Sequence, residues 1–128
     1  MKKTITMCAL LAGLALAGAQ SLRAQDLPEG VTQAMVEQGK QIFAGAGLCA
    51  ACHGPEGKGM VGPDLTDAEW LHGDGSYTFL VELITKGVSQ PKGPTGAIMP
   101  PKGGSAITED QVKAVAAYVW SLSHHGGH

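Results

Sequence analysis

Two cysteines and a histidine stand together in the segment Cys49-Ala50-Ala51-Cys52-His53. Two thiols three positions apart on a tight turn can reach the two vinyl groups on one edge of a porphyrin. The residue that follows can then present its imidazole to the iron. This order of residues is the attachment signature of c-type haem. The sequence therefore predicts one haem bound covalently through Cys49 and Cys52, with His53 as a ligand of the iron.

Two other kinds of site use the same cysteine spacing. A thiol redox pair of the thioredoxin type needs a βαβ context, and no strand pattern precedes Cys49. A structural zinc site needs a second pair of ligands at a suitable distance. The candidates for that pair are the histidines near the end of the chain: His124, His125 and His128. Both alternatives stay open at this point, while the pattern favours haem.

A methionine is the second axial ligand that we expect, because a thioether opposite histidine stabilises ferrous iron and fills its sixth position. Met99 lies in a Gly/Pro-rich stretch, residues 87–106, where prolines keep the chain out of a helix. Met60 follows His53 by only seven residues and would have to round the haem edge with little slack. Met35 lies on the apolar face of a predicted helix. We therefore expect Met99 to bind the iron and Met60 to pack in a loop.

Four segments have the sequence pattern of helices, at about residues 32–44, 66–73, 76–87 and 108–123. Thr66 and Thr108 each begin a capping box, and Ser76 is a predicted N-cap. No segment alternates with period two, so the prediction is an all-α fold. Only six aromatic residues follow residue 24. Four short helices with so little apolar bulk leave a core that a haem would complete.

The N-terminal residues have the pattern of a secretory signal peptide. Lys2 and Lys3 precede an apolar run of 15 residues that begins at Ile5, and small residues suited to cleavage end at Ala19 and at Ala24. The run is shorter than the roughly 20 residues that a membrane-spanning helix needs. We therefore expect residues 1–24 to be cleaved, residues 25–123 to form the cytochrome domain, and residues 124–128 to form a flexible His/Gly tail. The mature protein is expected to be exported, for example to the periplasm, without stable membrane insertion.

The charges of the expected mature chain argue against one class of function. Cleavage after Ala24 leaves six lysines, no arginine and eleven acidic residues, so nucleic-acid binding is not expected. Without arginine, the haem propionates need other donors, such as lysines, backbone N–H groups or the Trp70 indole. The stretch 86–106 contains no acidic residue and three lysines: Lys86, Lys92 and Lys102. It predicts a local positive patch that could orient an acidic partner.

Over nearly all of its expected mature length, the chain resembles the class I cytochrome c family. The resemblance rests on the Cys49–His53 motif, Gly62-Pro63-Asp64-Leu65, the Met99 loop, and two pairs of helical residues: Gly39 with Phe43, and Tyr118 with Trp120. It implies an all-α fold of about four short helices around one covalently bound haem. In this family the first and last helices cross at the glycine and the aromatic residues.

The same resemblance implies roles for two further residues. Pro63 should offer its carbonyl to Nδ1–H of His53, which sets the tautomer of the ring. Residues 66–73 and 116–122 resemble, more narrowly, haem domains of the dihaem subunit of cbb-type oxidases. Trp70 lies in the first of these segments, where it either binds a propionate or fills the core. The chain departs from the oxidase subunit in having one haem motif and no membrane span.

The function that follows from these expectations is the transfer of single electrons by a protein that is not an enzyme, because His/Met ligation leaves no open iron position. The expected partners are redox proteins: a membrane oxidase, a reductase or a dehydrogenase. The chain is expected to be a monomer. Two alternatives remain, a haem subunit of a larger oxidase or dehydrogenase complex and, less favoured, a gas-sensing or peroxidase-like protein whose Met99 dissociates.

Overall fold

The computed structural model describes residues 26–125, so the predicted signal peptide and the last three residues lie outside the described part. Its elements are α2 (Gln33–Ala44), α3 (Cys49–His53), α4 (Tyr77–Lys86), a 3₁₀ helix η1 (Pro101–Gly104) and α5 (Glu109–His125). No strand occurs among these residues, which confirms the all-α prediction. None of the described helices combines the length and hydrophobicity that a bilayer crossing requires.

Helices α4 and α5 begin where their capping residues predict. Ser76 Oγ accepts a hydrogen bond of 3.3 Å from the Phe79 amide at the start of α4. At the start of α5, Thr108 Oγ1 accepts from the Gln111 amide at 3.2 Å, and Gln111 Oε1 accepts from the Thr108 amide at 2.9 Å. This reciprocal pair is the expected capping box. Helix α5 continues to His125, beyond the expected end near residue 123.

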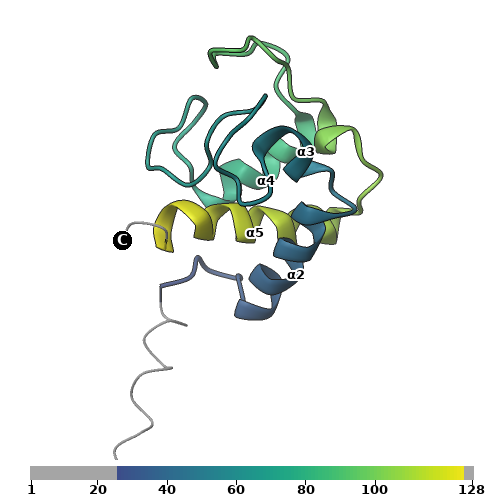
Figure 1. Cartoon of the computed structure of the whole chain (residues 1–128). Coiled ribbons are helices and arrows are strands. Elements are labelled where there is room, and N and C mark those ends of the chain that lie inside the picture. The colour runs from purple at the N-terminus through teal and green to yellow at the C-terminus, as the bar shows by residue number, and fades with distance from the viewer. Residues whose placement is uncertain (1–25, 126–128) are drawn as a thin grey trace, which may run out of the picture.

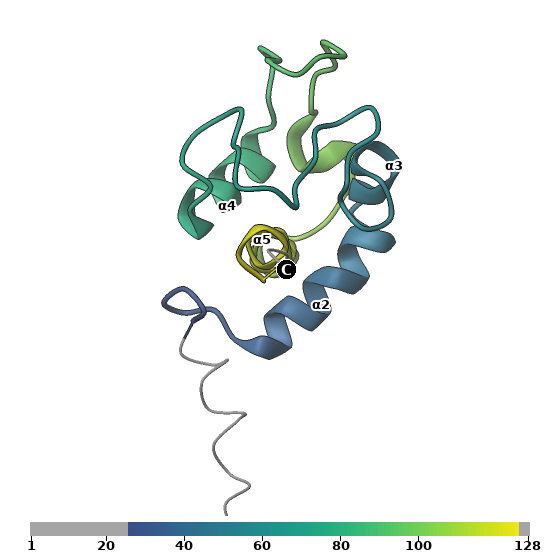
Figure 2. The same ribbon diagram turned by 60° about the vertical axis from the view of Figure 1, so that its left-hand side comes forward.

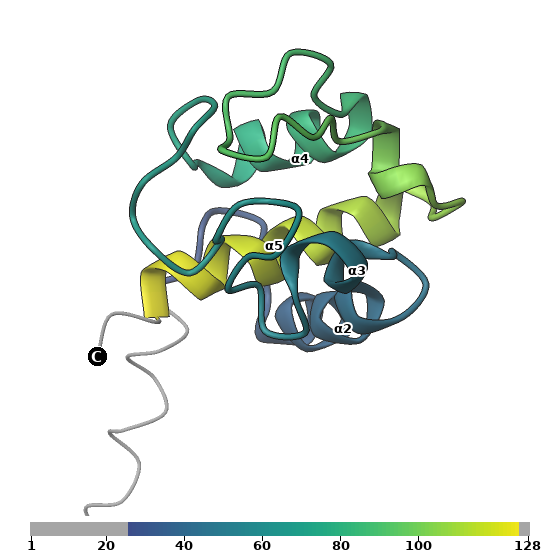
Figure 3. The ribbon, with the colours of Figure 1, turned by 45° about the horizontal axis from the view of Figure 1, so that its top comes forward.

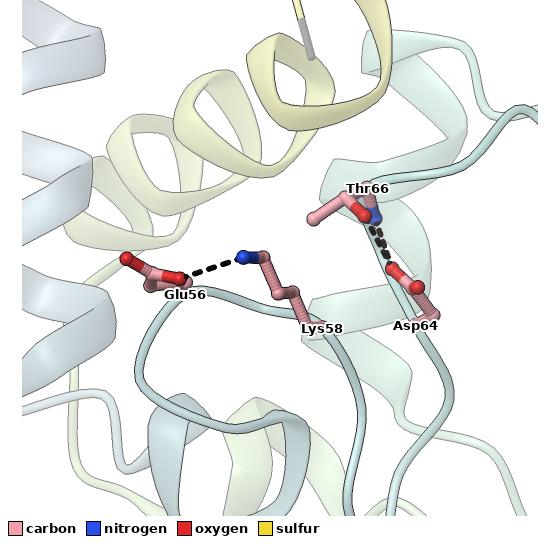
Figure 4. Close-up of polar contacts among 4 residues, drawn as sticks. All are labelled: Glu56, Lys58, Asp64 and Thr66. Atoms are coloured by element: carbon pink, nitrogen blue, oxygen red, sulfur yellow. Dashed lines mark hydrogen bonds and ion pairs between the residues drawn. The ribbon is translucent and has the colours of Figure 1, made fainter. Parts of the chain in front are cut away.

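The predicted helix over residues 66–73 is wrong. The Thr66 amide and hydroxyl both donate to Asp64 Oδ1, at 2.7 and 2.6 Å (Figure 4). The Glu69 amide donates to Asp67 Oδ1 at 3.0 Å, where a capping box would place it on the Thr66 hydroxyl. Asp carboxylates two residues away compete for these amides and favour turns over a helix. The segment is therefore an irregular loop that passes along one side of the molecule.

Helices α2 and α5 cross in close contact, as Figure 1 shows. Gly39 permits this approach, because a Cβ at this position would overlap the Ala114 carbonyl oxygen and lie 2.9 Å from Tyr118 Cβ. Phe43 and Tyr118 pack edge to face across the crossing, with ring centroids 5.3 Å apart. Trp120, which was expected at the crossing, instead stacks on His124 with a centroid distance of 3.8 Å.

Helix α4 packs on another side of α5. Figure 2 looks along α5 and shows α4 and α2 flanking it. Leu80 and Ile84 of α4 are buried in the main core, and the Tyr77 hydroxyl donates to the Lys113 carbonyl at 3.3 Å. Figure 3, with the top of the molecule turned forward, shows α4 on one side of α5, α3 on the other, and loops in front of α5. Three helices thus form a base on which loops can build a site.

Candidate haem-binding site

The cysteine motif forms a short helix that the sequence pattern did not predict, because five residues are too few to show a period. Leu48 precedes it with φ 59° and ψ 12°, a left-handed conformation that is uncommon for a bulky residue. This turn directs the chain into α3. Cys49 is half-buried and Cys52 is exposed, and both are free thiols. Three positions correspond to about one helical turn, so both thiols lie along the same side of α3.

His53 is held by the loop that follows it, the proximal loop, residues 54–65. Its Nδ1 lies 2.9 Å from the Pro63 carbonyl oxygen. A carbonyl oxygen only accepts, so Nδ1 carries the proton and donates, and Nε2 is left with the lone pair that a metal needs. Gly62 leaves room for the ring, since a Cβ there would lie 2.7 Å from His53 Cε1. The Gly62 amide also donates to the Cys52 carbonyl at 2.8 Å, which fixes the loop to α3.

A cavity of about 200 Å³ opens beside α3. Cys49, Cys52, His53 and Met99 all line it. The rest of its wall is largely apolar and includes residues of α4 and α5: Leu80, Leu83, Ile84 and Val119. Two thiols, an imidazole and a thioether on an apolar cavity match the donors and the environment that haem c requires.

Met99 reaches this cavity from the distal loop, residues 88–99. Its backbone pairs with Val88, with the Val88 amide donating at 2.7 Å and the Met99 amide at 3.0 Å. Its side chain is half-buried and packs against the main core. Met60 also lines the cavity but is 64% exposed, and it lies on the proximal loop beside His53. The two methionines therefore reach the cavity from different loops, and only Met99 comes from a loop separate from that of the histidine.

Trp70 and His72 also line the cavity. Trp70 is half-buried and packs against the main core. His72 is half-buried too, and the sequence pattern assigned it no role. Leu71, between these two residues, lines the same cavity, so the irregular loop shows no alternation of sides. No periodicity in the sequence could therefore have indicated His72, and the mistaken helix over residues 66–73 gave it a different position.

Burial and hydrogen bonding shift the pKa values of two acidic groups, the Cys49 thiol and the Asp64 carboxyl. Burial raises the pKa of the Cys49 thiol, because a low dielectric disfavours the thiolate, and the neighbouring Cys52 adds to the effect. The Thr66 hydroxyl and amide lower the pKa of Asp64 by donating to its carboxylate. Near Asp64, Lys58 forms an exposed ion pair with Glu56 at 3.0 Å (Figure 4). The proximal loop thus carries an ionised Asp64 directly after Pro63.

The described residues offer no support for the two alternatives to haem. Residues 26–125 contain no group of three His, Cys, Asp or Glu side chains placed to hold a metal ion. The same part of the chain has no strand before Cys49, so a βαβ context is absent there. The apolar cavity, in contrast, accounts for the shortage of core residues. The arrangement is that of a class I c-type cytochrome.

Comparison with known proteins identifies the family. Residues 34–119 match the family described as "Cytochrome C oxidase, cbb3-type, subunit III". The chain belongs to this family. Its relatives include Cbb3-type cytochrome c oxidase subunit CcoP of Rubrivivax gelatinosus, 46% identical over 88 residues, and subunit FixP of Sinorhizobium medicae, 39% identical over 94 residues. The alignments cover 66% and 69% of this chain but 25% and 28% of the relatives. The chain thus spans about a quarter of the length of these relatives.

Solved structures support the same fold. Cytochrome cL of Methylophaga aminisulfidivorans aligns with a TM-score of 0.57 at 21% identity, covering 88% of this chain and 69% of that one. Cytochrome cL of Hyphomicrobium denitrificans aligns with a TM-score of 0.50 at 26% identity, covering 70% and 48%. The predicted class I cytochrome fold is confirmed, and haem c, attached through Cys49 and Cys52, is the cofactor.

Proposed function

We propose that this protein is an exported monohaem carrier of single electrons in which His53 and Met99 are the two axial ligands of the iron. The observation that carries the proposal is their placement: both line one apolar cavity, His53 from α3 and Met99 from the loop between α4 and η1. With both residues bound, the iron has no open position for a substrate. Electron transfer without chemistry on a substrate is the function that this arrangement supports.

The chain's own residues prepare the site for this role. Bound haem c supplies the reversible change between ferric and ferrous iron. Pro63 fixes the tautomer of His53, and the Val88–Met99 backbone pair holds the base of the distal loop. The apolar wall excludes water, which favours the ferrous form with its lower charge. Trp70 is a donor available to a propionate from its place on the cavity wall.

The remaining parts of the proposal concern the whole protein. Residues 1–24 direct export and are removed, and the cytochrome domain begins at residue 25. His124 and His125, which the sequence placed in the tail, belong to α5, and residues 126–128 lie outside the described part. The mature protein is a monomer without stable membrane insertion, and its partners are redox proteins: a membrane oxidase, a reductase or a dehydrogenase. The intact mass of the exported protein tests the cleavage site and the haem content, since it should equal the mass of the chain from residue 25 plus one haem.

A second candidate function is that of a haem subunit in a larger oxidase complex. The observation that favours it is the family itself, because the relatives are named as subunits of cbb3-type oxidases. Purification in mild detergent separates the two candidates. A free carrier should be recovered alone, whereas a subunit should be recovered with the membrane oxidase.

The experiment that tests electron transfer is a spectroscopic redox titration followed by exposure to carbon monoxide. We expect one reversible transition that involves a single electron, and an unchanged spectrum of the reduced protein under carbon monoxide at neutral pH. Binding of carbon monoxide without denaturant would show that the sixth position opens readily. That result would contradict the carrier proposal and support a gas-sensing or peroxidase-like protein.

A further inference from the structure

The distal loop is fixed at its base but extends far from it. The Val88–Met99 backbone pair closes the base. Near the tip, the Gly96 amide donates to the Gly93 carbonyl at 3.1 Å and forms a turn. Ile98, between tip and base, is 63% exposed. Such a loop, with few buried contacts beyond its base, can open unless its tip is also tied to the rest of the molecule.

Thr95 provides a tie at this tip. Its hydroxyl donates a hydrogen bond of 2.7 Å to the carbonyl oxygen of Val61 in the proximal loop, 34 residues earlier in the chain. The Ala97 amide donates to the same hydroxyl at 3.3 Å, which orients its proton toward Val61. Among residues 26–125, this is the only hydrogen bond that joins the distal loop to the proximal loop.

The two loops that this bond joins carry the two sides of the haem site. Val61 lies next to Gly62, which packs against the His53 ring, and both residues line the cavity. Thr95 lines the same cavity four residues before Met99. The bond therefore connects the loop that orients His53 to the loop that supplies Met99.

We propose that Thr95 is a positioning residue whose hydroxyl ties the distal loop to the proximal loop and so limits opening of the cavity. The inference rests on the proposed ligation by Met99, because opening of the distal loop is what would withdraw the thioether from the iron. Thr95 does not touch the iron itself. Its effect is to lower the fraction of time in which Met99 is dissociated and a small ligand can enter.

The size of the effect follows from the exposure of the bond. A hydrogen bond between neutral groups contributes modestly because water competes for both partners. Loss of this one should raise the opening equilibrium by about five-fold. Thr95→Val removes the donor while keeping the shape of the side chain. Thr95→Ser is the matched control, because it keeps the hydroxyl and loses only the methyl group.

The test uses the haem-loaded, oxidised protein and two readouts. The first is hydrogen exchange of the backbone amides of the distal loop, and the second is the rate at which added imidazole replaces the sulfur ligand. We expect Thr95→Val to accelerate both by about five-fold and Thr95→Ser to resemble the wild type. Unchanged rates in Thr95→Val would overturn the proposal, as would equal acceleration in Thr95→Ser, which would assign the effect to the methyl group.

Failure of the ligand assignment gives a different result. If Met99 is not the ligand, Met99→Ala keeps the wild-type spectrum and the imidazole readout loses its meaning. Hydrogen exchange of the distal loop still decides whether the Thr95 hydroxyl restrains it. Two controls separate local opening from a general loss of stability. A generally destabilised variant would melt at a lower temperature, and hydrogen exchange would accelerate in α5 as well as in the loop.

Discussion

Asp64 stabilises the turn that follows Pro63, and Pro63 in turn orients His53. Two donors from Thr66 converge on its carboxylate, the hydroxyl at 2.6 Å and the amide at 2.7 Å. They favour the charged form, so the pKa of Asp64 is lower in the folded chain than its ordinary value of 3.8. The turn therefore has its full stability above about pH 4 and loses it as the pH falls through the lower pKa of the folded state.

Removal of the Thr66 hydroxyl should raise the pKa of Asp64 toward 3.8. Thr66→Val removes the hydroxyl hydrogen bond, which lowers the pKa of Asp64 more than the bond from the Thr66 amide does. Thr66→Ser keeps a hydroxyl and should leave the pKa low. A titration of the Asp64 carboxyl carbon by nuclear magnetic resonance from pH 2 to 6 measures this shift. An unchanged pKa in Thr66→Val would mean that the hydroxyl does not stabilise the carboxylate.

At this scale, the sequence predicts residues whose chemistry is set by local spacing. The Cys49–His53 motif was found because its three functional residues lie within five positions. His72 and Thr95 were not found, because their roles depend on which side of a loop they face and on contacts with distant residues. The Thr95 partner is 34 positions away, and no periodicity in the sequence indicates such a pairing.

Individual elements were predictable where their signals are local and uncontested. The starts of α4 and α5 follow from Ser76 and Thr108, because a cap needs only the residues of one turn. The helix over residues 66–73 failed for the same reason: Asp64 and Asp67 offer competing local bonds that a capping pattern does not include. The crossing of α2 and α5 is a longer-range feature. Gly39 in the middle of a helix indicates a close approach by another backbone, and the family resemblance identifies the last helix as the partner.

Gly39→Ala should destabilise the protein by separating α2 from α5. The new Cβ would overlap the Ala114 carbonyl, which is backbone and cannot rotate away. Overpacking of this kind typically costs about 1–3 kcal/mol in the free energy of unfolding. Gly93→Ala is the control, because its Cβ would lie 3.5 Å from Leu71 Cδ1, an ordinary contact. Denaturant unfolding of both variants measures the difference, and equal stabilities would mean that the helices do not need the close approach.

The charge of the whole molecule is distributed unevenly around the cavity. The structure reduces the predicted lysine patch to two members, because Lys86 pairs with Glu82 at 2.5 Å. Lys92 and Lys102 form no ion pair among residues 26–125. Lys92 lines the cavity, whereas Asp64, Asp67 and Glu69 line a second hollow that the proximal loop also borders. Lysines on the distal loop and η1, with carboxylates in this second hollow, would orient a charged partner during encounter.

Reversal of the two distal charges should slow oxidation of the reduced protein by ferricyanide, a small anionic reagent. Lys92→Glu with Lys102→Glu should lower the rate several-fold at low salt. The difference should shrink near physiological ionic strength, where the screening length is about 8 Å. The control, Lys40→Glu with Lys113→Glu, changes the net charge equally but on helices α2 and α5 instead of the distal loop and η1. Equal slowing in this control pair would show that net charge, and not the distal patch, governs the rate.

The central claim is that Met99 is the sixth ligand of the haem iron, and the absorption spectrum of the oxidised protein tests it most directly. Met99→Ala should abolish the weak sulfur-to-iron band and lower the reduction potential, because ferrous iron loses its soft ligand. Met60→Ala should leave both unchanged, since Met60 lies on the same loop that orients His53. Loss of the band in Met60→Ala and its survival in Met99→Ala would contradict the account.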